Sequence, residues 1–326
     1  MEIFDAVRAN LLSPAVLFFA LGLIAAVTKS DLKFPEALYV GLTIYLLVAI
    51  GFKGGVAINE AGLGKVWLPA LAAMTLGALI PLWTYPLLRF GGKFSAVDAA
   101  AIAAHYGSVS AVTFIAATNY LKAVNQPYEN YATAFLAVME SPAILVGVVL
   151  GKLATSQSGK PDLTSLKAAM HEAIFGRSIF LLVGALVVGW LCGKPGMDKV
   201  EPFFVTPFQG VLALFLLEMG LVAGRRLEDL KKVGPFLLAF GIVMPLIHGC
   251  VGVYLGQLTG LGLGGATLLG VLASSASYIA APAAIRMSLP DANPTFYLTA
   301  SLAITFPFNI ALGIPIYFEV ARWLYS

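Results

Sequence analysis

The chain has 326 residues, of which 59% are hydrophobic and only 11% are charged, and its mean hydropathy is +0.88. A soluble domain carries about a quarter charged residues, so this composition excludes a water-soluble globule and predicts an integral membrane protein in a lipid bilayer. The net charge of +3 is too small to indicate a nucleic-acid partner. Apolar runs of about twenty residues recur, which predicts membrane-spanning helices rather than the short alternating strands of a β-barrel.

The first apolar run follows Glu2, Asp5 and Arg8 and lacks a small-residue cleavage pattern, so we expect it to remain as a helix. Ten membrane-spanning helices are predicted in chain order, at about 9–28, 35–54, 65–90, 96–121, 131–153, 173–193, 204–223, 233–258, 263–288 and 295–324. The two cysteines, Cys192 and Cys250, form no CxxC pair. Neither a disulfide nor a transition-metal site is therefore indicated.

The longest polar interruption, 154–171, divides the chain into halves of similar size. We predict a first five-helix repeat at 1–153, a cytosolic linker at 154–171 and a second five-helix repeat at 172–326. The halves share landmarks: GFKGGVAI at 51–58 has a counterpart in GLVAGRRL at 220–227, and an Asn-x-Pro or Asn-Pro motif precedes the last span of each half. Because five is an odd number of crossings, the second repeat must enter the bilayer inverted.

Two of the predicted helices carry polar interruptions at corresponding places. The ninth span contains Ser274, Ser275 and Ser277 followed by Pro282, and the fourth contains the sequence YGSVSAVT at 106–113. Paired Gly/Ser/Pro-interrupted helices in two halves are typical of a transporter's binding site. The alternative is that these small residues only permit close helix packing. That alternative is favoured for a single segment, but the repetition favours discontinuous helices four and nine that cross at mid-membrane.

The ends of broken helices suit a small anion together with a small cation. The N-terminal end of a half-helix attracts anions, and free carbonyls beside hydroxyls suit sodium. The predicted substrate-binding residues are Gly107, Ser108, Ser110, Ser274, Ser275 and Ser277, and the predicted sodium-binding residues include Ser110, Thr113, Ser275, Ser277 and Glu140. No lysine or arginine lies within the breaks, which favours a small, weakly charged solute.

Two acids lie inside predicted spans, Glu140 beside Pro142 and Glu218 in an otherwise apolar run. An ionised side chain at bilayer centre is costly, so such residues are functional candidates. Glu140 is the stronger candidate, as a sodium or proton site. For each acid the alternative is a protonated glutamate satisfied by a neighbouring hydroxyl. Asp98, at the entry of the fourth span, is expected to be an acid in the first turn of a helix.

Lysine and arginine predict the orientation. Thirteen of the twenty lie on the side of the loops that follow odd-numbered spans, and seven lie on the other side. By the positive-inside rule the first side is cytoplasmic, so both termini lie on the outer side of the cell inner (plasma) membrane. Because no hydrolase, metalloprotease or nucleotide-binding motif is present, the chain is expected to be a secondary transporter and not an enzyme.

The same motifs resemble those of the cyanobacterial-type sodium-dependent bicarbonate transporters, the SbtA family. The similar stretches are GFKGGVAI at 51–58, YGSVSAVTFIAA at 106–117, MESPA at 139–143 and ASSASYIAAPAAIRMSLPDANP at 273–294. The resemblance covers nearly all of the chain. It implies ten helices in inverted repeats, a homotrimer, symport of bicarbonate with sodium, and regulation by a PII-like protein at the cytosolic face.

The chain departs from the family pattern at the ninth span. Where the family has Ser-Ser-Ser-Asp, this chain has Ser-Ala-Ser-Tyr at 275–278, so Tyr278 replaces an acid and becomes a candidate sodium contact that would resize the cavity. Glu140 stands where the family has aspartate. The alternatives are a proton-coupled or uncoupled carrier of another small anion, or a solute sensor that keeps the transporter fold.

Overall fold

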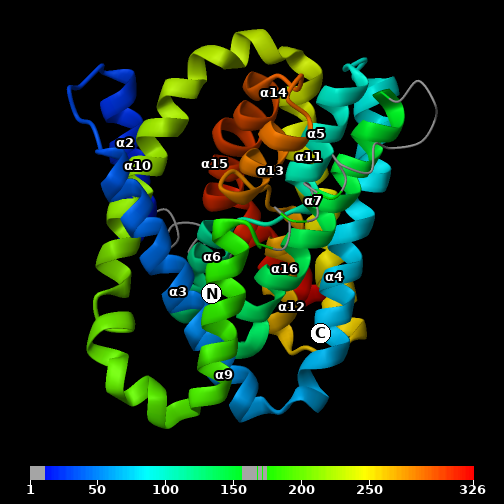
Figure 1. Ribbon diagram of the computed structural model, residues 1–326. Coiled ribbons are helices and arrows are strands. Elements are labelled where there is room, and N and C mark those ends of the chain that lie inside the picture. The colour runs from blue at the N-terminus through cyan, green and yellow to red at the C-terminus, as the bar shows by residue number, and fades with distance from the viewer. Residues whose placement is uncertain (1–11, 156–166, 168–170, 172–174) are drawn as a thin grey trace.

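The computed structural model describes residues 12–155, 167, 171 and 175–326, and every regular element in these ranges is helical (Figure 1). The first half contains α2 (Pro14–Val27), α3 (Glu36–Ala61), α4 (Leu63–Pro86), α5 (Ala96–Gly107), α6 (Ala111–Ala123) and α7 (Thr133–Thr155). The second half contains α9 (Arg177–Phe204), α10 (Phe208–Arg226), α11 (Leu230–Leu258), α12 (Leu263–Ser274), α13 (Ala280–Ser288), α14 (Pro294–Leu298), α15 (Phe306–Phe308) and α16 (Ile314–Leu324). The π-helical segments η4 (Thr299–Thr305) and η5 (Asn309–Gly313) join α14 to α16.

In the described residues, seven helical stretches are long and apolar enough to cross a membrane. One of them, Phe208–Leu258, contains both α10 and α11, and α2 and α12 are shorter apolar helices. In its described part each of the ten predicted ranges is largely helical, apart from short interruptions such as 108–110 and 275–279. The all-helical membrane class is therefore confirmed, while the number of crossings stays a prediction. Most of the predicted linker, 154–171, lies outside the described residues.

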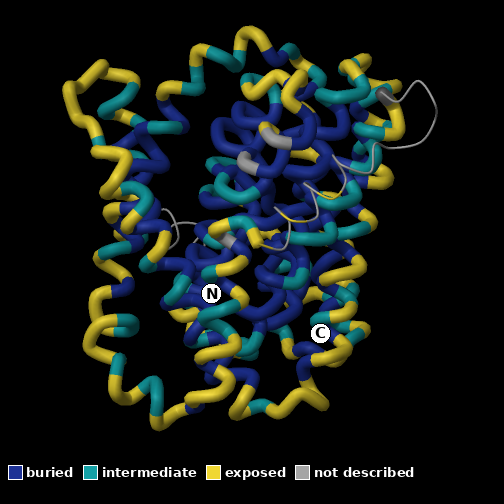
Figure 2. The backbone as a smooth tube through the Cα atoms, in the orientation of Figure 1, coloured by how far each residue is buried: buried dark blue, intermediate teal, exposed yellow. Residues whose placement is uncertain are grey.

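The helices form two bundles. In the small bundle, α2 packs against α10 and α3 packs against α9; α4 to α7 and α11 to α16 make up the large bundle. Figure 1 shows the small bundle, blue and green, to the left of the large one. Buried residues gather in the large bundle, around α5, α6, α12 and α13 (Figure 2). Apolar side chains such as Leu71, Val187 and Ile247 stay exposed on the outside, as lipid-facing residues do.

Glycines let the backbones of the small bundle approach closely. A Cβ atom on Gly55 of α3 would lie 1.9 Å from the carbonyl oxygen of Leu186 in α9, and one on Gly220 of α10 would lie 2.0 Å from that of Phe19 in α2. Small residues at such crossings allow the van der Waals contact that drives helix association in a bilayer. The glycine-rich motifs at 51–58 and 220–227 are therefore packing motifs on two paired helices.

Substituting Gly55 with alanine is expected to destabilise the protein, because the added methyl group collides with backbone that cannot rotate away. Overpacking costs typically about 1–3 kcal/mol. The measurement is the thermal unfolding midpoint of the purified protein in detergent. Gly41→Ala on the same helix is the matched control, since its Cβ would meet nothing within 4 Å. Equal midpoints for the two variants would contradict this account.

Candidate functional site

The first break separates α5 from α6. Helix α5 ends at Gly107, residues 108–110 are non-helical, and α6 begins at Ala111 with Ser110 as its N-cap. The Ser110 Oγ atom accepts a hydrogen bond of 3.1 Å from the backbone N–H of Thr113. Glycine is required at 107 because a Cβ there would lie 2.5 Å from Cγ of Pro81. The chain thus leaves the helix where small side chains allow it, and a serine hydroxyl caps the restart.

The second break separates α12, which ends at Ser274, from α13, which begins at Ala280. Three serine hydroxyls satisfy backbone groups around this interruption. Ser274 Oγ donates to the carbonyl of Val271 over 2.9 Å and Ser275 Oγ donates to that of Leu272 over 2.8 Å. Ser277 Oγ accepts from the N–H of Ala281 over 3.2 Å. Hydroxyls therefore replace part of the hydrogen bonding that the broken helix lacks.

The two breaks are joined directly by hydrogen bonds. The backbone N–H of Ser110 donates to Ser275 Oγ over 2.9 Å, and Ser110 Oγ donates to the Tyr278 hydroxyl over 3.1 Å. The backbone N–H of Ser277 donates to the carbonyl of His105 over 2.8 Å. All these residues are buried. Segments 165 residues apart in the chain therefore form one polar cluster inside the large bundle.

Glu140 lies next to this cluster. Its side chain is buried and, together with Ser110 and Tyr278, lines a central cavity of about 20 Å³. A water molecule needs about 10–15 Å³ of such volume, so the cavity holds one guest of that size. Its carboxylate and hydroxyl oxygens are the ligands that a hard cation prefers. A guest as small as a water molecule or a single cation matches this volume, whereas a polyatomic anion requires the cavity to widen.

Two buried polar atoms at the first break have no hydrogen-bond partner within the part of the chain that the structure describes. They are Nε2 of His105 and Oγ of Ser108, both in fully buried residues. The His105 ring is held by its other nitrogen, Nδ1, at 2.7 Å from the carbonyl of Ala101, and by stacking on Tyr297. Buried polar atoms without partners are rare and call for an explanation, of which a bound solute or water is one. These two atoms can therefore hydrogen-bond to a solute or water beside the polar cluster of Ser110, Ser275 and Tyr278.

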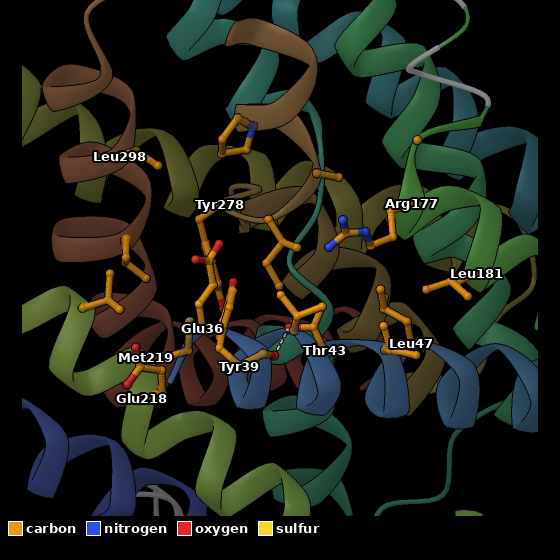
Figure 3. A pocket seen from close by; sticks show the side chains of 18 of the residues that line it. Glu36, Tyr39, Thr43, Leu47, Arg177, Leu181, Glu218, Met219, Tyr278 and Leu298 are labelled. Carbon is orange, nitrogen blue, oxygen red and sulfur yellow. Dashed lines mark hydrogen bonds between the residues drawn. The ribbon is translucent and has the colours of Figure 1, made fainter. Parts of the chain in front are cut away.

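Two large cavities lie between the bundles, on either side of the central cavity. The Glu36 cavity, of about 650 Å³, is lined by the N-terminal half of α3 from Glu36 to Leu47. The Glu60 cavity, of about 640 Å³, is lined by the C-terminal half of α3 from Ile50 to Glu60. Figure 3 shows Tyr278 among the side chains of the Glu36 cavity, near Glu36 and Tyr39. Both cavities thus open along one helix, toward its opposite ends.

The structure brings some of the predicted site residues together and leaves others outside the central cavity. Ser110, Ser275 and Tyr278 are brought together, and Glu140 shares a cavity with Ser110 and Tyr278. Ser108 and Thr113 flank Ser110, Gly107 packs on Pro81, and the hydroxyls of Ser274 and Ser277 are turned toward their own backbone. Glu218 lies on the wall of the Glu36 cavity, which Tyr278 also lines, and does not line the central cavity (Figure 3).

Sequence reasoning missed Asn309, which is fully buried. Its Nδ2 atom donates to the carbonyl of Ser274 over 2.9 Å, and its Oδ1 atom accepts from the Tyr317 hydroxyl over 3.0 Å. It therefore supports the end of α12 at the second break. The available signal was an amide side chain inside an otherwise apolar predicted span.

Two acids also make contacts that link the halves of the chain. Asp98, in the first turn of α5 as predicted, accepts a 2.8 Å bond from the backbone N–H of Asn293, just before α14. Glu129, just before the 3-10 turn that leads into α7, accepts a 2.7 Å bond from the backbone N–H of Gly262, just before α12. Each acid ties the start of a helix in one half to the start of a helix in the other.

The sequence was compared with families and with curated proteins. It matches the family model of the Na⁺-dependent bicarbonate transporter superfamily over residues 14–322, which includes both breaks and both bundles. No curated protein matched the chain.

Proposed function

Because the chain belongs to the Na⁺-dependent bicarbonate transporter superfamily, we propose that it is a secondary transporter that carries bicarbonate in symport with sodium. The observation that carries this proposal is the polar cluster of Ser110, Ser275 and Tyr278, which lies between two cavities of nearly equal volume. A carrier that works by alternating access needs one central site that each side reaches in turn.

Several features support sodium and a small anion as the transported pair. Glu140, Ser110 and Tyr278 offer oxygen ligands around a space of the right size for one cation. Ser110 caps the N-terminus of α6, where backbone N–H groups favour an anion. The Ser108 hydroxyl, which has no partner among the described residues, is an additional donor. A sodium ion beside Glu140 would place positive charge close to the anion and so couple the two.

The proposed topology is ten crossings in two inverted repeats of five. The contacts of Asp98 with Asn293 and of Glu129 with Gly262 support the repeats, because span four meets span ten as span five meets span nine. The positive-inside rule places the Glu36 cavity on the cytoplasmic side and both termini outside. Location in the plasma membrane, assembly as a homotrimer and binding of a PII-like regulator are proposed from the family resemblance.

The test is uptake of labelled bicarbonate into proteoliposomes under imposed sodium, potassium or proton gradients. We expect a sodium gradient to drive accumulation and a potassium gradient to have no effect. Uptake that ignores both sodium and pH gradients would overturn coupled transport. Uptake driven by the pH gradient alone would favour a second candidate, a proton-coupled anion carrier. This candidate is motivated by Glu140, a buried carboxyl group without an ion-pair partner among the described residues.

Replacing Ser275 with alanine is expected to lower uptake by about tenfold. The change removes the acceptor of the Ser110 N–H and leaves that buried donor unsatisfied, which costs about 1–3 kcal/mol. Uptake rate at matched protein incorporation is the measurement. Ser301→Ala is the control, because Ser301 is equally buried but donates only to backbone carbonyls of its own helical stretch. Equal uptake in the two variants would move the site away from the second break.

A further inference from the structure

Tyr278 stands between the central cavity and the Glu36 cavity. Among the described residues, only Leu47, Tyr278 and Ile279 line both cavities. The two spaces are therefore neighbours, separated by these side chains. Tyr278 is the largest of the three and the one whose polar tip is hydrogen-bonded. Figure 3 shows Tyr278 among the side chains that line the Glu36 cavity.

Two contacts hold Tyr278 in this position. Its hydroxyl accepts a 3.1 Å hydrogen bond from Ser110 Oγ across the breaks. Its ring packs edge-to-face on Phe306, with 5.3 Å between the ring centroids. The residue is 8% exposed, so it fills the space rather than projecting freely into the cavity. One contact is polar and one is aromatic, and each is worth about 1 kcal/mol.

Contacts of this strength hold a side chain in place without locking it. Tyr278 lies in the non-helical stretch between α12 and α13, where no helical hydrogen bonding fixes the backbone. A rotation of the side chain into the adjoining Glu36 cavity breaks these two contacts and exposes part of the buried ring. A minor state that lies a few kcal/mol higher is populated to about 0.1–10%. The residue therefore has the strength of attachment and the location that a movable barrier requires.

We propose that Tyr278, held by Ser110, is the inner barrier of this transporter, which closes the central cavity toward the Glu36 cavity until the tyrosine swings away. The inference rests on the proposed transport function, since it assigns the step by which the central site opens toward one side. It assigns to Tyr278, which stands where the family has an acid, the function of closing the pathway. Solute leaving through the Glu36 cavity passes Tyr278. The hydroxyl group of Tyr278 is hydrogen-bonded to Ser110, which lines the central cavity that the ring closes.

The test measures how fast cysteines on either side of Tyr278 react with a membrane-impermeant thiol reagent. The native cysteines, Cys192 and Cys250, are exposed and are first replaced by serine. Ala111→Cys then reports on the central cavity, which Ala111 lines. Val222→Cys reports on the Glu36 cavity and identifies the vesicle orientation in which the reagent enters it. Each reporter is combined with Tyr278, with Tyr278→Phe and with Tyr278→Ala.

We expect Tyr278→Ala to raise the labelling rate of Ala111→Cys by at least about tenfold, because two contacts and the bulk of the ring are lost. Tyr278→Phe keeps the ring and removes one hydrogen bond of about 0.5–1.5 kcal/mol, so the rise is about two- to tenfold. Val222→Cys is expected to react at the same rate in all three backgrounds. This unchanged rate also shows that the variants are folded.

Equal labelling of Ala111→Cys in all three backgrounds would overturn the barrier. The experiment does not depend on transport, so it separates the two proposals. Increased labelling in the Tyr278→Ala background, together with no bicarbonate uptake by the protein that retains Tyr278, would support the barrier and reject the transport function. Normal uptake with unchanged labelling would reject the barrier alone.

Discussion

Glu140→Gln is expected to lower sodium-driven uptake by about 100-fold or more. The change keeps the size of the side chain but removes the carboxyl group that would carry the negative charge in the central cavity when a cation is bound. A cation at that site would then be buried without its counter-charge, and removing one partner of a buried ion pair costs about 3–5 kcal/mol. Since each 1.36 kcal/mol is a factor of ten, the smaller figure already gives a loss of about 100-fold. The measurement is the initial rate of bicarbonate uptake at fixed sodium.

Glu60→Gln is the matched control, because it removes a glutamate charge at an exposed position on the wall of the Glu60 cavity, away from the breaks. We expect its uptake to change by less than about threefold, in line with the small free energies of partly solvated charges. If Glu140→Gln retains full sodium-dependent uptake, Glu140 is not the cation site. A variant that loses pH dependence but keeps sodium dependence would identify Glu140 as a proton site instead.

Cross-linking the two bundles is expected to abolish transport. Asn119 of α6 and Gln209 of α10 exchange two amide hydrogen bonds, of 3.1 and 2.8 Å, across the bundle interface beside the Glu60 cavity. If the bundles move relative to each other during transport, this pair must separate. A covalent link in its place would hold the Glu60 cavity in one state.

The experiment uses Asn119→Cys with Gln209→Cys in the background free of Cys192 and Cys250, and a short bifunctional thiol reagent that a reductant cleaves. Uptake should fall to background after cross-linking and return after reduction. Asn59→Cys with Trp190→Cys is the control, since Asn59 donates a 2.9 Å bond to the Trp190 carbonyl within the small bundle. Undiminished uptake after complete cross-linking of the first pair would show that the bundles do not separate there.

The membrane class and the helix positions followed from the sequence because lipid imposes a simple rule. Every spanning segment must be apolar and must satisfy its own backbone hydrogen bonds. Each long apolar helix can therefore be predicted from its own residues, without knowledge of its neighbours. The serine-containing stretches at 106–113 and 274–277 also stood out in the sequence, because they occur at corresponding places in the two halves. Glu140 stood out as an ionisable residue in an apolar run.

The particular side-chain contacts between distant segments were beyond sequence reasoning. Tyr278 was identified as a substituted position, yet its bond to Ser110 spans 168 residues and depends on how two breaks meet. The roles of Asn309 and of the amide pair between Asn119 and Gln209 also arise only when separate helices pack. The division into two bundles is likewise absent from the local pattern, because α2 pairs with α10 and α3 with α9.

The sequence by itself determined that the chain is a helical membrane protein, where its helices lie and which residues interrupt them, because the bilayer acts on each segment independently. Only the tertiary structure decided which of the interrupting side chains meet, that Glu140 shares a small cavity with Ser110, and that Tyr278 lines both this cavity and the Glu36 cavity. These outcomes depend on packing in three dimensions, where the partner of a side chain is chosen by the shape of neighbouring helices. The residue types by themselves do not determine which side chains come into contact.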